Sequence, residues 1–172
     1  MIFRILSNAM ELDKFKEFIA SIPDESKEDL TIYLNGSGGD VSVMFNYLDF
    51  FENYKGNITL VVTEKIISAD FFLFVLSNTR KKVSPMANGY WHKAFIGEMS
   101  LSNNKEVVIH RYRAMETVDR LNGYFESKIY PLFTSEEIQV YESNEDVFLN
   151  AYRMQELAMK AEKLFFREKC KR

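Results

Sequence analysis

The sequence predicts a single α/β domain, residues 1–172, built around a mostly parallel β-sheet. Near the N-terminus the order strand, glycine turn, helix occurs twice, and this alternation is typical of parallel strands joined by covering helices. The 172 residues are 47% hydrophobic and 27% charged, which supplies enough apolar side chains for the core of one domain. The same composition excludes a disordered, low-complexity chain.

Apolar and β-branched runs predict the strands of the first half, and apolar residues at helical spacing predict its helices. Strands are expected over residues 2–6, 30–34 and 58–63, and helices over residues 10–22, 41–54 and 69–76. Pro23 ends the first helix, because proline lacks a backbone N–H donor. Three glycines between residues 35 and 40, and Gly56 further on, mark turns between strands and helices.

The segment after the third helix is more polar. Residues 77–82 are predicted to be a polar connection. Val83 and residues 88–92 are predicted to form two short strands on either side of Pro85.

The last third of the chain is predicted to be mainly helical. Residues 105–130 have the period of one long helix, which Pro131 stops. Thr134 and Glu137 have the spacing of a helix start with a capping box. A last, highly charged helix is expected over residues 152–170.

Charge and ligand content exclude several classes of protein. The net charge at pH 7 is −3, without the basic footprint of a nucleic-acid binder. A single cysteine, Cys170, can form no internal disulfide, and with two histidines it makes a structural zinc site improbable. We expect no metal, no cofactor and no nucleic-acid partner.

Hydropathy indicates the location of the protein, and its aromatic content indicates an oligomer. The longest apolar run, residues 71–76, is far below the roughly 18 residues that suggest a membrane span. The first residues are too polar, and too short a run, for a signal peptide. We expect a cytoplasmic protein with no membrane partner. Aromatic residues make up 15% of the chain, which favours burial of some of them between subunits of a homo-oligomer.

The glycine turn between the second strand and second helix presents free backbone N–H groups. Such a turn holds an anion or a developing oxyanion. It equally fits a phosphate cradle, although it lacks the Walker lysine–serine ending and the spaced glycines of dinucleotide sites. Both interpretations stay open at this point.

Ser68 and His92 each allow a structural and a chemical interpretation. Ser68 precedes a predicted helix, so its hydroxyl is either an N-cap or a nucleophile at the positive end of the helix dipole. His92 ends an aromatic strand and is either a partly buried histidine satisfied by hydrogen bonds or a general base.

Four segments in this order resemble motifs of the proteolytic subunit of the Clp protease. Residues 33–41 (YLNGSGGDV) resemble the strand and NSPGGxV turn of that family, and residues 66–73 (IISADFFL) lie where it has AASMGAFL. Residues 88–92 (NGYWH) lie where it has NSRxMIHQP, and residues 144–151 (NEDVFLNA) resemble ERDxFLSA. The predicted long helix, with residues 118–122 (VDRLN), is similar to the family's handle helix. The resemblance implies the ClpP/crotonase-like fold of repeated ββα units with a protruding handle helix over about residues 105–130.

Carried over to this sequence, the resemblance implies a serine peptidase. Ser68 would be the nucleophile, His92 the general base, and Asp146 the carboxylate that orients the imidazole.

The resemblance also assigns backbone groups. The N–H groups of Gly39 and Ala69 would form the oxyanion hole, and Gly38 and Gly97 would contact the substrate. The implied partners are peptides or unfolded proteins, other copies of the chain in a heptameric ring or stacked rings, and, less directly, a Clp-type ATPase.

Departures from the family pattern motivate two alternatives. Asp70 stands where the family has a glycine two places after the nucleophile, and its charge would oppose an oxyanion unless it points outward. Glu64 and Ile67 replace small family residues before the serine. A catalytically silent Clp-like subunit with a structural or regulatory role is therefore a second hypothesis. A crotonase-like acyl-CoA enzyme, which shares the ββα architecture, is a third.

Overall fold

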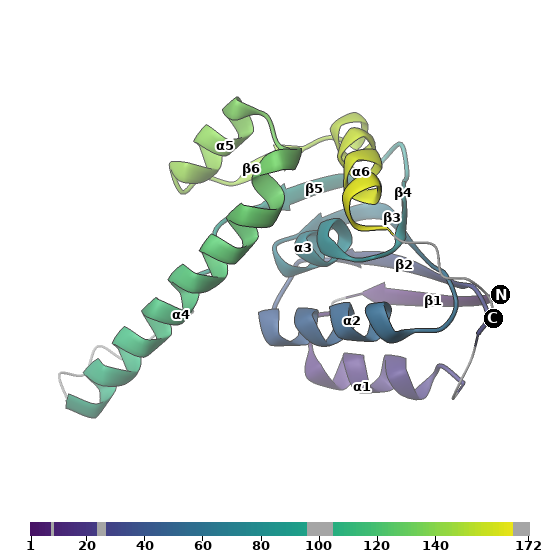
Figure 1. The fold of residues 1–172 in the computed structure, drawn as a ribbon, viewed down its shortest axis with the longest axis horizontal. Helices are drawn as coiled ribbons and strands as arrows, with labels where there is room; N and C mark the ends of the chain where they lie inside the picture. The colour runs from purple at the N-terminus through teal and green to yellow at the C-terminus, as the bar shows by residue number, and fades with distance from the viewer. Residues whose placement is uncertain (8, 24–26, 96–104, 167–172) are drawn as a thin grey trace. The chain divides into compact units, whose positions relative to one another are not determined.

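The computed structural model describes residues 1–7, 9–23, 27–95 and 105–166, which fall into two compact units. One unit combines Met1–Trp91 with the chain from Asp146 onward, and the other is His92–Glu145. The elements of the first unit (Figure 1) are β1 (Ile2–Ser7), α1 (Leu12–Ala20), β2 (Leu30–Gly36), α2 (Val41–Asn53), β3 (Ile58–Ile67), α3 (Ala69–Leu76), β4 (Arg80–Val83), β5 (Asn88–Trp91), β6 (Val147–Leu149) and α6 (Ala151–Phe165).

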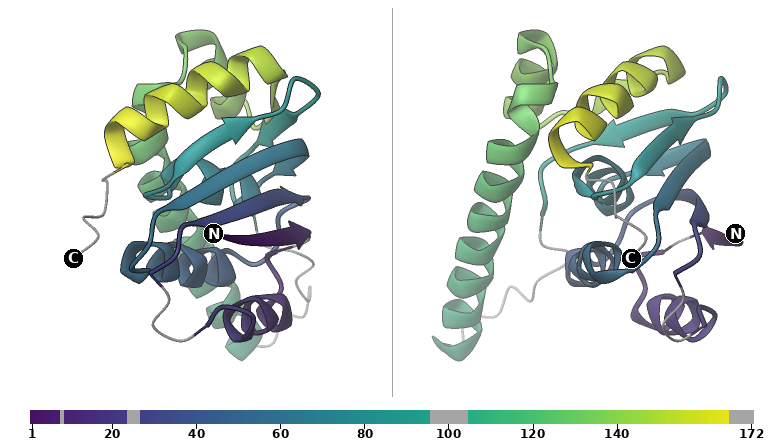
Figure 2. Two further views of the ribbon diagram at one scale, coloured as in Figure 1. Left: turned by 90° about the vertical axis from the view of Figure 1, so that its right-hand side faces the viewer. Right: turned by 45° about the vertical axis from the view of Figure 1, so that its right-hand side comes forward.

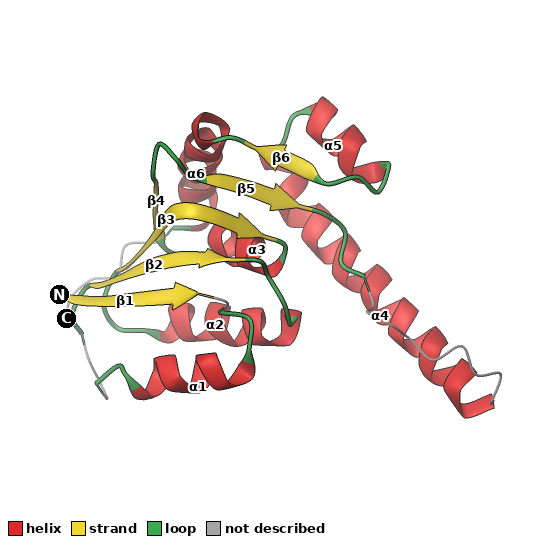
Figure 3. Ribbon diagram, turned by 180° about the vertical axis from the view of Figure 1, so that it is seen from behind, coloured by secondary structure: helices red, strands yellow, loops and turns green. Residues whose placement is uncertain are grey.

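The first unit contains one six-stranded sheet. Its strands follow the order β1-β2-β3-β5-β6, and β4 pairs with β3 beside β5 (Figure 3). All pairs are parallel except β5 with β6. The predicted α/β class with a mostly parallel sheet is confirmed.

Helices α1, α2 and α3 lie on the same side of this sheet, and α6 packs against β4 and β5 (Figure 2). Alternate residues of β2, namely Leu30, Ile32 and Leu34, are buried, as the two-residue period of a strand requires. Almost every residue of α3 is buried as well, from Ala69 to Val75. The core of the unit therefore lies between the sheet and these helices.

The second unit is helical. It comprises the long helix α4 (Lys105–Ile129), a short 3-10 turn (Tyr130–Leu132) and α5 (Ser135–Glu142). Pro131 falls in the 3-10 turn that follows α4, which confirms the predicted stop. The predicted start of α5 is also confirmed, because Thr134 and Glu137 form a reciprocal capping box.

The prediction that residues 77–82 are an irregular connection is wrong for its last part. Arg80–Val83 form β4, which pairs in parallel with residues 59–62 of β3. Lys81 is buried in this strand and donates from Nζ to the carbonyl oxygens of Ser77 and Thr79 at 2.8 and 3.0 Å. Local polarity misled the prediction, because backbone pairing with β3 and the apolar stem of lysine allow a basic residue inside the sheet.

Gly56 lies where the α2–β3 turn packs closely against the segment before β2, so a substitution at Gly56 tests this packing. A Cβ added at Gly56 would lie 2.2 Å from the carbonyl oxygen of Glu28, which is backbone and cannot rotate away. We expect Gly56→Ala to lower the free energy of unfolding by about 1–3 kcal/mol, measured by urea denaturation.

The matched control is Gly123→Ala in α4, where an added Cβ meets nothing within 4 Å. This change should stabilise the helix by about 0.5–1 kcal/mol, because alanine has the higher helix propensity. Equal urea midpoints for Gly56→Ala and the unmodified protein would contradict the close approach.

Candidate active site

The candidate site lies at the carboxyl ends of β2 and β3, where ligand sites of open parallel sheets are usually found. Leu34 pairs with Val62, but Gly36 pairs with Ile66, so β3 gains two residues relative to β2. The Asn35 side chain fills this irregularity. Its Nδ2 donates to Thr63 Oγ1 at 2.7 Å, and its Oδ1 accepts from the Thr63 and Glu64 N–H groups at 3.2 and 2.9 Å. This network fixes where the glycine turn meets the end of β3.

Ser68 occupies a sharp turn between β3 and α3. Its backbone has φ 55° and ψ −121°, a left-handed conformation that residues other than glycine rarely adopt. Two backbone bonds hold it there: its N–H donates to the Tyr90 carbonyl at 3.0 Å, and its own carbonyl accepts from the Phe72 N–H at 3.0 Å. Its hydroxyl makes no capping bond to α3, so the N-cap interpretation does not account for this serine. The arrangement has the strand–turn–helix context of a nucleophile elbow.

Gly38 brings the glycine turn into contact with this elbow. Its φ is +83°, and an added Cβ would lie 2.7 Å from the Ser68 Cβ, 2.8 Å from the Ile67 carbonyl oxygen and 3.1 Å from the Ala69 nitrogen. A side chain at this position would therefore push the serine away. Only glycine permits both the positive φ and the close approach.

Gly39 faces a different neighbour. Its φ is +141°, and an added Cβ would lie 2.9 Å from the Cβ of Met10. Ala69, the other predicted oxyanion donor, is the buried first residue of α3. The oxyanion roles of Gly39 and Ala69 remain predictions.

Asp70 differs from most carboxylates in proteins, which lie at the surface. It is 0% exposed, so it does not point outward, as one of the two sequence-based interpretations held. Its Oδ2 accepts a hydrogen bond from the Gly38 N–H at 2.8 Å, whereas its Oδ1 has no hydrogen-bond partner within the described residues. The carboxylate therefore engages the glycine that lies against Ser68.

The surroundings of Asp70 are apolar and poorly hydrated. Burial raises the pKa of its carboxyl to about 6, and the hydrogen bond from Gly38 opposes part of this shift. Tyr47 of α2 is fully buried nearby, and its hydroxyl has no hydrogen-bond partner within the described residues. Burial raises the pKa of this phenol, and the Asp70 charge raises it further.

His92 opens the second unit and is half-buried. Its Nδ1 lies 2.8 Å from the carbonyl oxygen of Lys93, and its ring lies 5.6 Å from that of Phe95. Because a carbonyl can only accept, Nδ1 carries the proton in this contact and Nε2 of a neutral ring is left as the base. Asn122 of α4 holds the segment through two bonds to Ala94, at 2.7 and 3.2 Å.

Asp146 is exposed and immediately precedes β6 in the first unit. Val147 pairs with Trp91 across the antiparallel β5–β6 ladder. In the chain, Asp146 is the neighbour of Val147, and His92 is the neighbour of Trp91. The strand β6 was not predicted. Its signal was the alternation of buried Val147 and Leu149 with exposed Phe148, too short to stand out in the sequence.

The predicted substrate contact at Gly97 lies outside the described residues, as does Cys170. Among residues 1–7, 9–23, 27–95 and 105–166, no group of three His, Cys, Asp or Glu side chains is placed to hold a metal ion. In the same part of the chain, no helix is long and apolar enough to cross a membrane.

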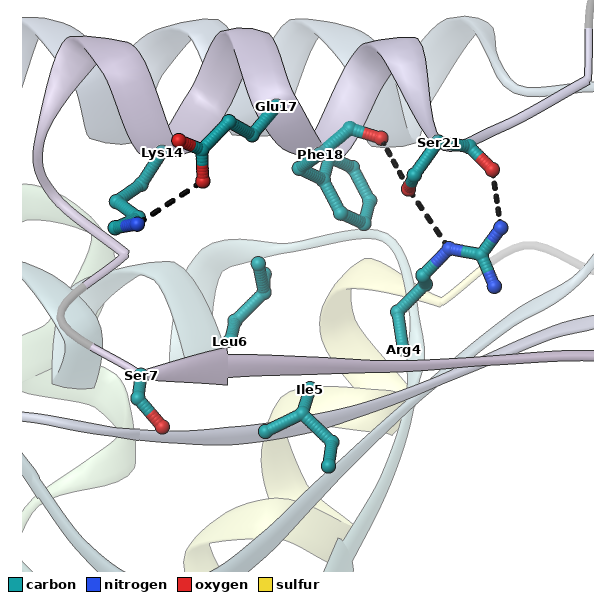
Figure 4. Close-up of a pocket in the computed structure, with 8 residues that line it drawn as sticks. All are labelled: Arg4, Ile5, Leu6, Ser7, Lys14, Glu17, Phe18 and Ser21. Atoms are coloured by element: carbon teal, nitrogen blue, oxygen red, sulfur yellow. Dashed lines mark hydrogen bonds and ion pairs between the residues drawn. The ribbon is translucent and has the colours of Figure 1, made fainter.

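A pocket between β1 and α1 is formed by residues other than those of the predicted site (Figure 4). Its charged side chains are already engaged. Arg4 Nε donates to Ser21 Oγ at 2.7 Å, and Lys14 Nζ bonds Glu17 at 3.0 Å. The Arg4–Ser21 bond ties β1 to the end of α1, and the Lys14–Glu17 pair lies within α1, so these contacts give the pocket a structural explanation.

Comparison with known proteins agrees with this geometry. The family model for Clp protease matches residues 9–158. A solved structure of a mutant of ClpP1 from Listeria monocytogenes is similar with a TM-score of 0.63 and 16% sequence identity, over 92% of this chain and 87% of that chain. At this identity the likeness concerns the fold. No curated protein matches the sequence.

The burial of Asp70 predicts a specific dependence of stability on pH. The raised pKa means that the folded state binds the Asp70 proton more tightly than the unfolded state, whose carboxyl has a pKa near 3.8. Stability from this group is therefore present below about pH 4 and is lost as the pH rises through about 6. We expect the unfolding free energy, relative to Asp70→Asn, to fall by about 2 kcal/mol between about pH 4 and pH 7.

Urea denaturation of both proteins at several pH values measures this difference. The asparagine variant is the matched control, since it keeps the size of the side chain and cannot ionise. A difference that stays constant with pH would show that the Asp70 carboxylate is hydrated in the folded protein.

Proposed function

Because this chain belongs to the Clp protease family, we propose that it is a serine peptidase that hydrolyses peptide bonds through Ser68, His92 and Asp146. The proposal combines the peptidase activity expected of that family with the local geometry of each residue. Its substrates are peptides or unfolded protein segments, and its assembly is a ring-shaped homo-oligomer.

The backbone of Ser68 is the observation that carries the proposal. A serine held at positive φ costs about 1–3 kcal/mol in conformational strain, and such strain concentrates at functional sites. The strain brings the serine to the end of β3, at the N-terminus of α3, with its hydroxyl free of a capping bond. The helix dipole at this position favours negative charge on the attacking oxygen.

The chemistry follows as acyl transfer. Ser68 Oγ attacks the scissile carbonyl carbon while His92 Nε2 takes the hydroxyl proton. The imidazolium then gives this proton to the leaving amine as the peptide C–N bond breaks. A water molecule, deprotonated by the same imidazole, attacks the acyl-serine ester and releases the carboxylate product. Asp146 stabilises the imidazolium.

Two backbone amides are the candidates for the oxyanion hole, and each would contribute about 3 kcal/mol to transition-state stabilisation. The N–H of Ala69, the first residue of α3, is the proposed first donor. For the other we propose Gly39, the second glycine of the turn, because the Gly38 N–H already donates to Asp70. Gly38 is the proposed substrate contact, in the turn that lies against Ser68.

The proposed oligomer is supported by exposed apolar side chains. In the first unit, the large hydrophobic residues that are more than half exposed are Met1, Phe3, Ile5, Met86, Phe148, Tyr152, Met159 and Leu164. An interface between subunits would remove such side chains from water. A degradative peptidase also gains from a ring, because the ring confines its reactive serines.

A catalytically silent Clp-like subunit is the second candidate. The observation that favours it is the buried Asp70 carboxylate, which accepts from the Gly38 N–H at 2.8 Å and so brings a negative charge next to the glycine that lies against Ser68. In such a subunit the fold would serve assembly alone.

Reaction with a fluorescent fluorophosphonate separates the two candidates. The probe phosphonylates serines whose proton is removed by a base, so we expect covalent labelling of the purified oligomer that disappears in Ser68→Ala. Ser42→Ala, an exposed serine at the start of α2, is the matched control and should label like the unmodified protein. Absence of labelling in every variant would favour the silent subunit.

The contact between His92 and the Lys93 carbonyl predicts that loss of His92 and loss of Asp146 slow the labelling of Ser68 by different factors. We expect His92→Ala to slow labelling by about 1,000-fold or more, because the general base is lost. Asp146→Ala should slow it by only about 10–100-fold, because the Lys93 carbonyl continues to hold the imidazole tautomer. Second-order labelling rates measure both effects, and equal losses would mean that Asp146 alone orients the ring.

A further inference from the structure

The segment that carries His92 is held by an asparagine of α4. Residues 92–95, which follow β5, form no helix or strand, so no backbone ladder fixes their position. Asn122 Oδ1 accepts from the Ala94 N–H at 2.7 Å, and Asn122 Nδ2 donates to the Ala94 carbonyl oxygen at 3.2 Å. Because an N–H can only donate and a carbonyl can only accept, these two bonds fix the orientation of the Asn122 amide. His92, Ala94 and Asn122 all belong to the second unit.

The shorter of these bonds ends on the peptide group that His92 also contacts. The carbonyl of Lys93 lies 2.8 Å from His92 Nδ1, and it belongs to the same planar peptide group as the Ala94 N–H. Asn122 and His92 therefore bond the two ends of one rigid group. An acceptor on the N–H polarises such a group and strengthens its carbonyl as an acceptor, by about 10–30% per bond.

The side chain of Lys93 holds the same peptide group through α5. Its Nζ lies 5.4 Å from the centre of the Tyr141 ring, within the range of a cation–π contact. The same Nζ donates to the carbonyl oxygen of Glu142 at 3.4 Å. Both helices of the second unit therefore hold the group that faces His92 Nδ1.

We propose that Asn122 is a positioning residue for His92, which it orients through the Lys93–Ala94 peptide group. The fixed carbonyl keeps the ring proton on Nδ1, so Nε2 stays free to accept the proton of Ser68. This role rests on the proposed peptidase function. It adds that a residue of α4, which does not touch the substrate, controls the general base.

The sequence around both partners agrees with this role. Asparagine is a poor helix former, so its presence within α4 calls for a reason other than the helix itself. The Clp protease motif NSRxMIHQP has a proline two residues after its histidine, where this chain has Ala94. Proline has no N–H to donate, so the bond to Asn122 depends on a residue in which this chain departs from the motif.

The tautomer of His92 is the first readout, because a merely structural asparagine would not change it. It is measured by ¹⁵N nuclear magnetic resonance of the purified protein labelled at histidine, at a pH where the ring is neutral. His110 is the other histidine of the chain, so His110→Gln assigns the signals. We expect the Nδ1-protonated form to predominate, and its ratio to the other tautomer to fall about 5-fold in Asn122→Ala, the effect of weakening one hydrogen bond.

The rate of fluorophosphonate labelling at Ser68 is the second readout. Asn122→Ala should slow labelling by about 10-fold, because a displaced base takes the serine proton less often. Asn122→Asp keeps an oxygen that accepts from the Ala94 N–H and loses only the weaker bond, so its rate should stay within about 3-fold of the unmodified protein. Ser127→Ala removes a bond within α4, from Ser127 Oγ to the Tyr124 carbonyl, and should label like the unmodified protein.

The outcomes separate the positioning role from the function on which it rests. An unchanged labelling rate or an unchanged tautomer ratio in Asn122→Ala would overturn the role and leave the peptidase standing. Equal losses in Asn122→Ala and Asn122→Asp would also overturn it, because the acceptor on the Ala94 N–H would then be irrelevant. No labelling of the unmodified protein, with the tautomer change intact, would overturn the peptidase alone. If Asn122→Ala does not fold, Asn122→Leu carries the same expectations.

Discussion

The close approach of the Gly38 backbone to Ser68 is the constraint on which the rest of the site depends. It requires a residue without a side chain at φ +83°. It also requires the end of β2 to lie next to the end of β3, so that the two turns that follow these strands meet. The Asn35 side chain meets the second requirement by bonding the irregular stretch of β3 at Thr63 and Glu64. The site is therefore a property of the sheet register as much as of its reactive residues, since a shift of either strand would separate the glycine turn from the serine.

Local chemistry explains which parts of this fold could be predicted. The glycine turn, the buried helix α3 and the stop at Pro131 each have a signal confined to a few residues, and all three were predicted from the sequence. A short strand was predicted at Val83, but the first part of β4 and all of β6 were missed, because their stability comes from partners far away in the chain. Lys81 shows this well, since its strand is recognisable only once β3 is known to lie beside it.

The same distinction applies to the candidate site. Ser68 and the glycine turn were identified because their motif positions are local, and the structure adds the strained backbone that sets Ser68 apart from an ordinary N-cap. For Asp70 the sequence left two directions open, toward the oxyanion site or toward solvent. The direction of the Asp70 side chain depends on the packing of α3 against α2 and on the bond from the Gly38 N–H. Both bring together residues that are far apart in the sequence.

The strained backbone of Ser68 and the buried charge of Asp70 both lower the stability of the folded protein, but their effects on nucleophilic attack are opposite. A strained serine favours nucleophilic attack, and a buried carboxylate on the neighbouring amide opposes the charge that attack creates. The strained serine therefore favours the proposed peptidase, and the buried carboxylate favours the silent subunit. The rate at which Ser68 reacts with a fluorophosphonate therefore decides which of the two features governs the site.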